Sequence, residues 1–195
     1  MTAFTLNCLI KAVIKMGRPY PKFTYEDYLL LPEDKHYELI EGELVMVPSP
    51  GRKHQRVLGR LYQTLSRFLE RKNLGELYMA PFDIVLSPTV VVQPDLLFVS
   101  RERLLIITEA NIQGPPDLVA EILSSDHEKD RGIKKKLYAK FGVEEYWIVD
   151  PEGKSIEVME LEEKGFRTVG IFKSKDVLTT KTFPGLNIKT FEVFS

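Results

Sequence analysis

One carboxylate occupies a position where an apolar residue is expected. Glu121 lies within the short run Asp117–Leu123, which is otherwise apolar after its first residue and is bounded by turn residues. Such a run is typical of a buried strand. An isolated ionised carboxylate there costs several kcal/mol. A cation, a metal ion or protonation must compensate for that cost, and each makes Glu121 a candidate for chemistry.

Asp95 is the second acid that could act with Glu121. It follows Pro94, and because Pro-Asp pairs are common in turns, Asp95 alone has a structural explanation. Two acids on neighbouring strands can hold a hard divalent cation, since Mg²⁺ typically takes one or two carboxylates and keeps several waters. Asp117 lies on the same strand face as Glu121, so it either joins this site or begins the strand.

Lys134 is the cation predicted to approach Glu121. The sequence predicts a helix over residues 126–141, directly after the Glu121 strand. At about 100° per residue, Lys134 falls near the middle of an apolar arc. That arc comprises Ile133, Leu137, Tyr138 and Phe141. Either the ammonium pairs with Glu121, or the stem is buried while the charge reaches solvent.

The other elements predict an α/β fold, a mixed β-sheet flanked by helices. A capping-box pattern at Thr24 and Asp27 begins a short helix, and a turn at Glu41-Gly42 joins the two strands of a hairpin over residues 36–47. An apolar stripe at helical spacing predicts a long helix over residues 52–71. A β extension is expected at the C-terminal end. Strands are predicted at Glu76–Met79, Phe82–Leu86, Val90–Val99, Glu145–Asp150, Ile156–Leu161 and Phe166–Phe172.

Length and composition favour one domain. The 195 residues suit a single domain over residues 17–195, and we expect residues 1–16 to be a disordered or loosely packed lead segment. Cys8 is the only cysteine, which excludes an internal disulfide framework and fits a reducing cytoplasm. No run of 18 apolar residues occurs, so no membrane span is expected.

Positive charge is concentrated in two segments of a chain whose net charge is −1. Arg52–Lys72 holds seven basic residues against one acid, and Lys129–Lys140 holds six against one. These segments are either solvated helix faces or a surface for a nucleic-acid backbone. The candidate contacts are Arg52, Arg56, Arg60, Lys135 and Lys136.

These residues resemble the PD-(D/E)XK nuclease superfamily, which has a restriction-endonuclease-like fold. The resemblance is closer to one branch, the Uma-two family of restriction endonuclease domains, and covers roughly residues 23–190. A proline-aspartate pair followed by a lone glutamate would be a weak signal, whereas a long string of matching segments is specific. They are Tyr37–Val45, His54-Gln55, Val92–Val99, Gly114–Ser124, Asp130–Lys134 and Tyr138–Pro151.

The resemblance implies a metal-dependent endonuclease that hydrolyses DNA. Asp95, Glu121 and the backbone carbonyl of Ile122 match the metal ligands, with Mg²⁺ or Mn²⁺ as the ion. The superfamily's usual lysine is absent, because the third position of its E-x-K element is Leu123. Lys134 matches the lysine that this branch takes from the following helix. Because symmetric dimers are common, a homodimer is also an expectation.

Three further residues are candidate accessories. Glu38 and Glu43 come from the early hairpin and could supply an outer acid, although each is expected on an exposed strand face. His54 could contact phosphate or water, or be an ordinary residue of the first helical turn.

Two other functions remain open. The displaced lysine and modest net charge also fit a non-catalytic module that binds nucleic acid or a partner. Alternatively, a Glu121–Lys134 ion pair could serve the core of a structural protein.

Overall fold

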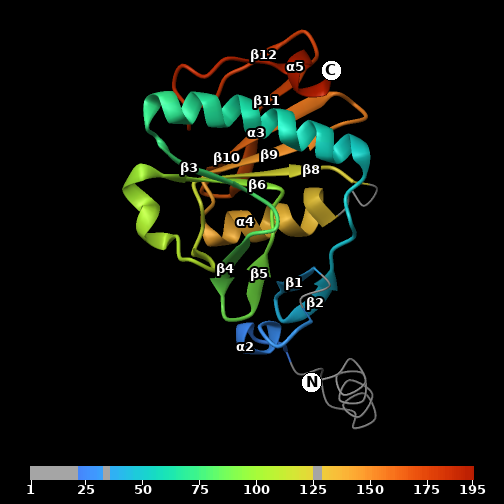
Figure 1. Ribbon diagram of the computed structural model, residues 1–195, viewed down its shortest axis with the longest axis vertical. Helices are drawn as coiled ribbons and strands as arrows, with labels where there is room; N and C mark the ends of the chain where they lie inside the picture. The colour runs from blue at the N-terminus through green and yellow to red at the C-terminus, as the bar shows by residue number, and fades with distance from the viewer. Residues whose placement is uncertain (1–21, 33–35, 125–128) are drawn as a thin grey trace.

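The fold stacks helices and two large β-sheets in layers (Figure 1). The computed structural model describes residues 22–32, 36–124 and 129–195. The predicted lead segment, residues 1–16, lies outside these ranges. In the part of the chain so described, no helix has both the length and the apolar character needed to cross a membrane.

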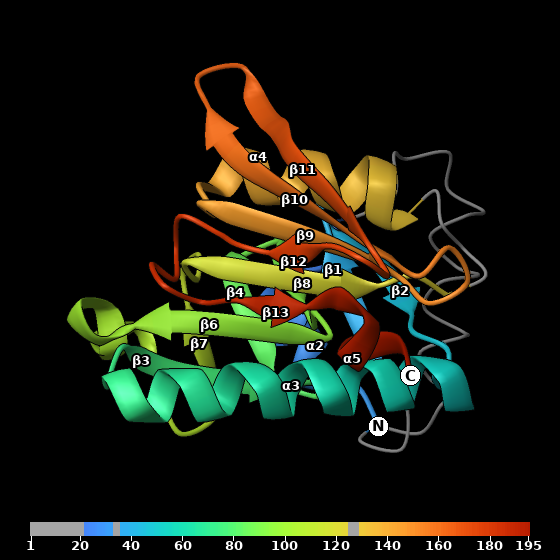
Figure 2. The same ribbon diagram turned by 90° about the horizontal axis from the view of Figure 1, so that it is seen from above.

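The central layer is a six-stranded mixed sheet with the order β11-β10-β9-β8-β6-β3 (Figure 2). The pairing of β8 with β9 is parallel, and the other pairings are antiparallel. The mixed sheet flanked by helices is therefore confirmed. The strands are β3 (Gly75–Met79), β6 (Leu96–Ser100), β8 (Leu118–Ile122), β9 (Glu145–Asp150), β10 (Ser155–Glu162) and β11 (Gly165–Lys173).

Helix α3 (Arg52–Lys72) covers one face of this sheet. Its predicted apolar stripe is buried against strand residues, and Asn73 ends the helix in the left-handed region at φ 52°. The C-terminal segment packs on the same side and adds the last pieces of the β extension. These are β12 (Val177–Leu178), β13 (Ile188–Lys189) and α5 (Thr190–Phe194).

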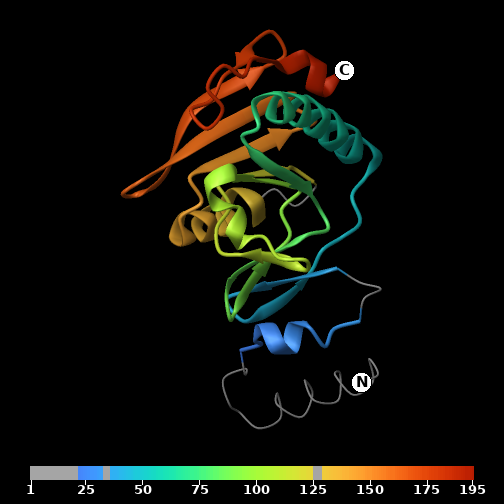
Figure 3. The same ribbon diagram turned by 60° about the vertical axis from the view of Figure 1, so that its left-hand side comes forward.

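Helix α4 (Lys135–Phe141) packs against the opposite face, between the central sheet and a second one (Figure 3). A π-helical turn, η2 (Lys129–Lys134), leads into it. The second sheet has the order β2-β1-β5-β4-β7, with α2 (Tyr25–Tyr28) on its outer side. Its strands are β1 (Tyr37–Ile40), β2 (Glu43–Met46), β4 (Asp83–Ser87), β5 (Val90–Val92) and β7 (Asn111–Gln113).

The structure corrects the predicted strand at Val90–Val99. This segment forms β5 and β6, which belong to different sheets, and the chain crosses between them at Gln93–Asp95. Pro94 has no N–H to donate, so the segment cannot continue as one central strand. The 3₁₀ helix η1 (Arg101–Ile106) and β7 were not predicted.

The apolar arc predicted around Lys134 is partly wrong. Leu137 and Tyr138 are buried, but Ile133 is 53% exposed. The arc assumed a regular α-helix, whereas Ile133 lies in the π-helical turn, where the angular spacing of side chains differs. In the sequence, Ser125 and Glu128 have the spacing of a capping box at the start of the predicted helix, and both lie outside the described residues.

Candidate active site

Asp95 and Glu121 meet where the chain passes from one sheet to the other. Strands β6 and β8 pair Leu96 with Ala120, and the next step of this register sets Asp95 opposite Glu121. Residues opposite each other in an antiparallel pair share a face of the sheet. Glu121 lies on the face that α4 covers, whereas Asp95, one residue before β6, contacts Ile122 and His54 of α3.

Backbone and side-chain contacts fix the Asp95 carboxylate. Its Oδ2 accepts a hydrogen bond from the Ile122 backbone N–H at 2.7 Å and lies 3.0 Å from His54 Nε2. Its Oδ1 accepts no hydrogen bond within the part of the chain that the structure describes. His54 Nδ1 is buried and likewise has no hydrogen-bond partner there. The His54 ring at the start of α3 thus orients Asp95.

Lys134 lies between two buried carboxylates. Its Nζ is 2.8 Å from Glu121 Oε1 and 2.9 Å from Glu38 Oε1, and the three side chains are at most 6% exposed. The contact between Lys134 and Glu121, predicted from the position of Lys134 in the helix, is present in the structure. The expectation that Glu38 lies on an exposed strand face is wrong, because its side chain is fully buried.

Tyr138 supplies a further donor to Glu121. Its hydroxyl donates to Glu121 Oε1 at 2.7 Å from α4. Burial, with the negative charges of Glu121 and Glu38, raises the pKa of Tyr138 well above its ordinary value. The hydroxyl therefore keeps its proton and remains a donor. The sequence pattern did not indicate this role, because the spacing of Tyr138 fits the apolar arc alone.

Four of these residues line one cleft of about 810 Å³. Asp95, Glu121, Lys134 and His54 contribute to it, and the loop over residues 47–51 forms part of its wall. Ile122 and Leu123 also line it. Leu123 holds the position of the usual superfamily lysine and is 6% exposed.

A family model described as "Putative restriction endonuclease" matches residues 25–190. The chain belongs to this family. A solved structure of a "putative nuclease belonging to DUF820" from Anabaena variabilis has a similar fold, with a TM-score of 0.73 and 19% sequence identity. The match covers 88% of this chain and 97% of that one. At this identity the likeness establishes the fold alone. A search of curated proteins found no match.

In this member of the restriction endonuclease family, the donor set suits a hard divalent cation. Two carboxylates and a nearby backbone carbonyl are oxygen ligands, which Mg²⁺ prefers together with several waters. The Ile122 carbonyl faces the Asp95 side, because the N–H and C=O of one strand residue point the same way. Among the described residues, no group of three or more His, Cys, Asp or Glu converges as a metal site. A cage built entirely from side chains, as structural zinc requires, is therefore not formed by these residues.

A polar network extends from the cleft to α2. The Gln93 amide Nε2 donates to Asp83 Oδ1 at 2.7 Å, and the Tyr28 hydroxyl donates to the same oxygen at 3.0 Å. Burial raises the pKa of Asp83, although both hydrogen bonds oppose that shift. No local sequence pattern indicates these three residues, because they are separated along the chain and only the fold brings them together.

Two predicted accessory acids lie elsewhere. Glu43 is exposed on β2 and does not line the cleft. Asp117 lies at the opposite end of β8, where it accepts from the Ser100 N–H and pairs with Arg103 at 3.1 Å. It lines a different cavity. Asp117 therefore begins the strand, which is the structural alternative left open by its position in the sequence.

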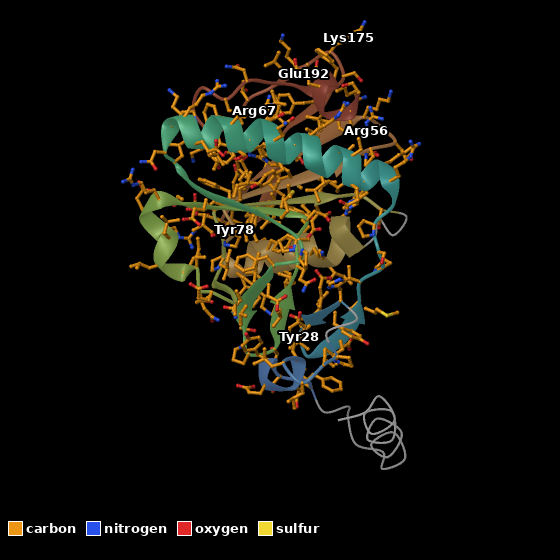
Figure 4. All side chains as sticks on the ribbon, viewed as in Figure 1. Tyr28, Arg56, Arg67, Tyr78, Lys175 and Glu192 are labelled. Carbon is orange, nitrogen blue, oxygen red and sulfur yellow. The ribbon has the colours of Figure 1, made fainter. Side chains whose placement is uncertain are left out.

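The predicted nucleic-acid contacts are spread over two helices. Arg52 and Arg56 are exposed on α3, and Figure 4 shows Arg56 on the side of the molecule remote from Tyr28 and α2. Arg60 instead donates to the Glu192 carbonyl at 3.3 Å and to Ser195 Oγ at 2.5 Å. Its guanidinium thus anchors α5. Lys136 is exposed on α4 and Lys135 is half-buried; neither lines the cleft.

Proposed function

We propose that this protein is a metal-dependent endonuclease that hydrolyses phosphodiester bonds in DNA. The observation that carries the proposal is the convergence of Asp95, Glu121 and Lys134 on one cleft. Membership of the restriction endonuclease family supports the same reaction class. Two oxygen ligands beside a buried ammonium form a site that can hold a divalent cation and stabilise negative charge.

Asp95, Glu121 and the Ile122 carbonyl would hold Mg²⁺ or Mn²⁺. A bound divalent ion of this kind lowers the pKa of a water ligand and offsets charge on a phosphate oxygen. Lys134, with Nζ 2.8 Å from Glu121, would orient the attacking water or stabilise the charge that develops on the phosphate. His54 and the Ile122 N–H keep the Asp95 carboxylate in one orientation throughout.

A non-catalytic nucleic-acid or partner-binding module is the second candidate. It is favoured by the charge state of the cleft, where both lining lysines already contact carboxylates. Lys53 pairs with Glu152 at 2.7 Å, and Lys134 pairs with Glu121 and Glu38. Leu123 also leaves the cleft without the superfamily's usual lysine.

A plasmid nicking assay with Mg²⁺ or Mn²⁺ tests the proposal. We expect the wild-type protein to cut, and Asp95→Asn and Glu121→Gln each to lower the rate by at least about 100-fold, because several kcal/mol of charge stabilisation is lost. Asp117→Asn is the matched control, since this buried acid immediately precedes the same strand but lies outside the cleft. It should cut at the wild-type rate.

Each alternative has its own outcome. Salt-sensitive DNA binding without cleavage under either metal would favour the binding module. Absence of both cleavage and metal binding by calorimetry, together with a large loss of stability in Glu121→Gln, would favour a structural ion pair. Equal cutting by wild type and both site variants would overturn the proposed chemistry.

A further inference from the structure

Glu38 is the most deeply buried acid next to the candidate site, and it comes from the second sheet. Its side chain is 0% exposed on β1. Its Oε1 accepts from the Gln93 backbone N–H at 3.1 Å and lies 2.9 Å from Lys134 Nζ. One carboxylate oxygen therefore joins β1, the crossing segment at Gln93–Asp95 and the start of α4.

The Glu38 carboxylate is costly for the fold. Its neighbours along β1, Leu39 and Ile40, are buried apolar residues. A buried carboxylate loses its hydration, and an apolar residue of similar volume commonly gives equal or greater stability. Fold stability alone thus does not explain an acid at this position. The Lys134 ammonium, 2.9 Å from Glu38 Oε1, provides a reason for it.

Lys134 needs a partner that does not itself bind the metal. Lysine carries its charge on a flexible four-carbon stem, so a single contact leaves the ammonium poorly fixed. Glu121 is a proposed metal ligand, and a divalent ion bound there would repel the ammonium beside it. Glu38 attracts Lys134 from another strand and another sheet, which offsets that repulsion.

We propose that Glu38 is a positioning residue that holds the Lys134 ammonium beside Glu121 when the divalent cation is bound. This rests on the proposed nuclease function for its catalytic consequence. The anchoring of Lys134 by Glu38 is a separate property of the protein, because the contact joins two of its own side chains.

Two measurements on Glu38→Gln test this role. The first is the cleavage rate, for which we expect kcat to fall about 10- to 100-fold with KM for DNA unchanged, as for other residues that orient a metal site's ligands. The second is reductive methylation of lysines in the metal-free protein, followed by mass spectrometry. We expect Lys134 to be labelled faster than in wild type, with the exposed Lys136, two residues further along in α4, as the internal reference.

Glu145→Gln is the matched control. Glu145 is also buried, on β9, and accepts hydrogen bonds from Trp147, Thr180 and Thr182 outside the cleft. It should leave kcat and Lys134 labelling at wild-type values. Glu38→Asp keeps the charge on a shorter side chain, so it should give an intermediate kcat and tests the same contact if the glutamine variant does not fold.

The outcomes separate the two proposals. Unchanged Lys134 labelling in both Glu38 variants, or a wild-type kcat in both, would overturn the positioning role. A loss of kcat no larger than that of Glu145→Gln would also overturn it. If the wild-type protein cuts no DNA, the proposed function fails, while the labelling rates still decide whether Glu38 anchors Lys134.

Discussion

One oxygen of Glu121 receives two different donors, and this defines the site at the scale of single residues. The Lys134 ammonium lies 2.8 Å from Oε1, and the Tyr138 hydroxyl donates to the same atom at 2.7 Å. Both donors come from the η2–α4 segment. Strand β8 supplies the negative charge of Glu121, and the η2–α4 segment supplies the two donors that stabilise it.

Tyr138→Phe should reduce stability because Glu121 loses a buried donor. A hydrogen bond to a charged group contributes about 1.5–3 kcal/mol, so we expect the free energy of unfolding at neutral pH to fall by about that amount. Urea unfolding of both proteins measures it. The phenylalanine fills nearly the same volume. A fall in the free energy of unfolding of less than about 1 kcal/mol would contradict the proposed contribution of this hydrogen bond.

The pH dependence of the same pair follows from the raised pKa of Tyr138. The folded protein keeps the phenolic proton at a pH where the unfolded chain releases it, near an ordinary pKa of about 10. This stabilisation is therefore fully present below about pH 10 and is lost as the pH rises toward the folded-state pKa. Wild type should lose stability more steeply than Tyr138→Phe above this pH. If the free energy of unfolding fell in parallel with rising pH in the two proteins, the pH dependence would not come from Tyr138.

At the scale of elements, the Glu121 carboxylate and the lysine beside it come from different elements, β8 and the η2–α4 segment, whereas the superfamily usually takes both from one strand. Residues 121 and 123 of the same strand point to one face, and here position 123 is an apolar core residue. Helix α4 packs on that face, and Lys134, the last residue of η2 before it, supplies the ammonium. A lysine therefore lies beside Glu121 in the folded protein, although Leu123 fills the position where the superfamily's lysine usually stands in the sequence.

Moving the lysine back to the strand tests this division. Lys134→Met should lower cleavage by about 100- to 1000-fold, the cost of removing one preorganised charge-stabilising donor. Adding Leu123→Lys to that variant should recover at least roughly tenfold, because the new ammonium extends from the same strand face as Glu121. Leu123→Met in the Lys134→Met background is the uncharged control. Equal rates in the two double variants would contradict this geometry.

Local patterns predicted the elements better than the contacts between them. The capping box at Thr24, the α3 stripe and the Glu121 strand are local signals, and each is present in the structure. The change of sheet at Pro94 was missed, because Val90–Val99 is apolar on both sides of the break. The burial of Glu38 was also missed, since its partner Lys134 is distant in sequence and only tertiary packing brings them together.

At the scale of the whole molecule, the basic residues do not all have the same surroundings. Arg52 is exposed immediately beside the cleft-lining residues Gly51 and Lys53, whereas Arg60 is engaged by the C-terminal helix. Figure 4 shows Arg67 farther along α3 from Arg56. Arg52 and Arg67 are about 22 Å apart along the helix at 1.5 Å per residue.

This distance provides a test of where DNA lies. Arg52→Ala should weaken DNA binding across sequences and reduce the slope of log affinity against log salt by about 1, because one phosphate contact is removed. Arg67→Ala is the matched control on the same helix and should leave the slope at the wild-type value. Fluorescence anisotropy over a salt series measures both. An equal reduction in the two variants would place the DNA along α3 rather than at the cleft.

The two-sheet origin of the site also affects how a newly made chain behaves during synthesis. Glu38 is made early, Asp95 and Glu121 follow, and β8 gains its parallel partner only after the whole of β9 has been made. Fragments that stop before Lys134 lack the ammonium and leave both of its carboxylate partners without that contact. An incomplete translation product therefore carries Glu38 and Glu121 without the lysine that lies between them in the folded protein. Under the proposed nuclease function, such a product would lack one of the groups on which cleavage depends.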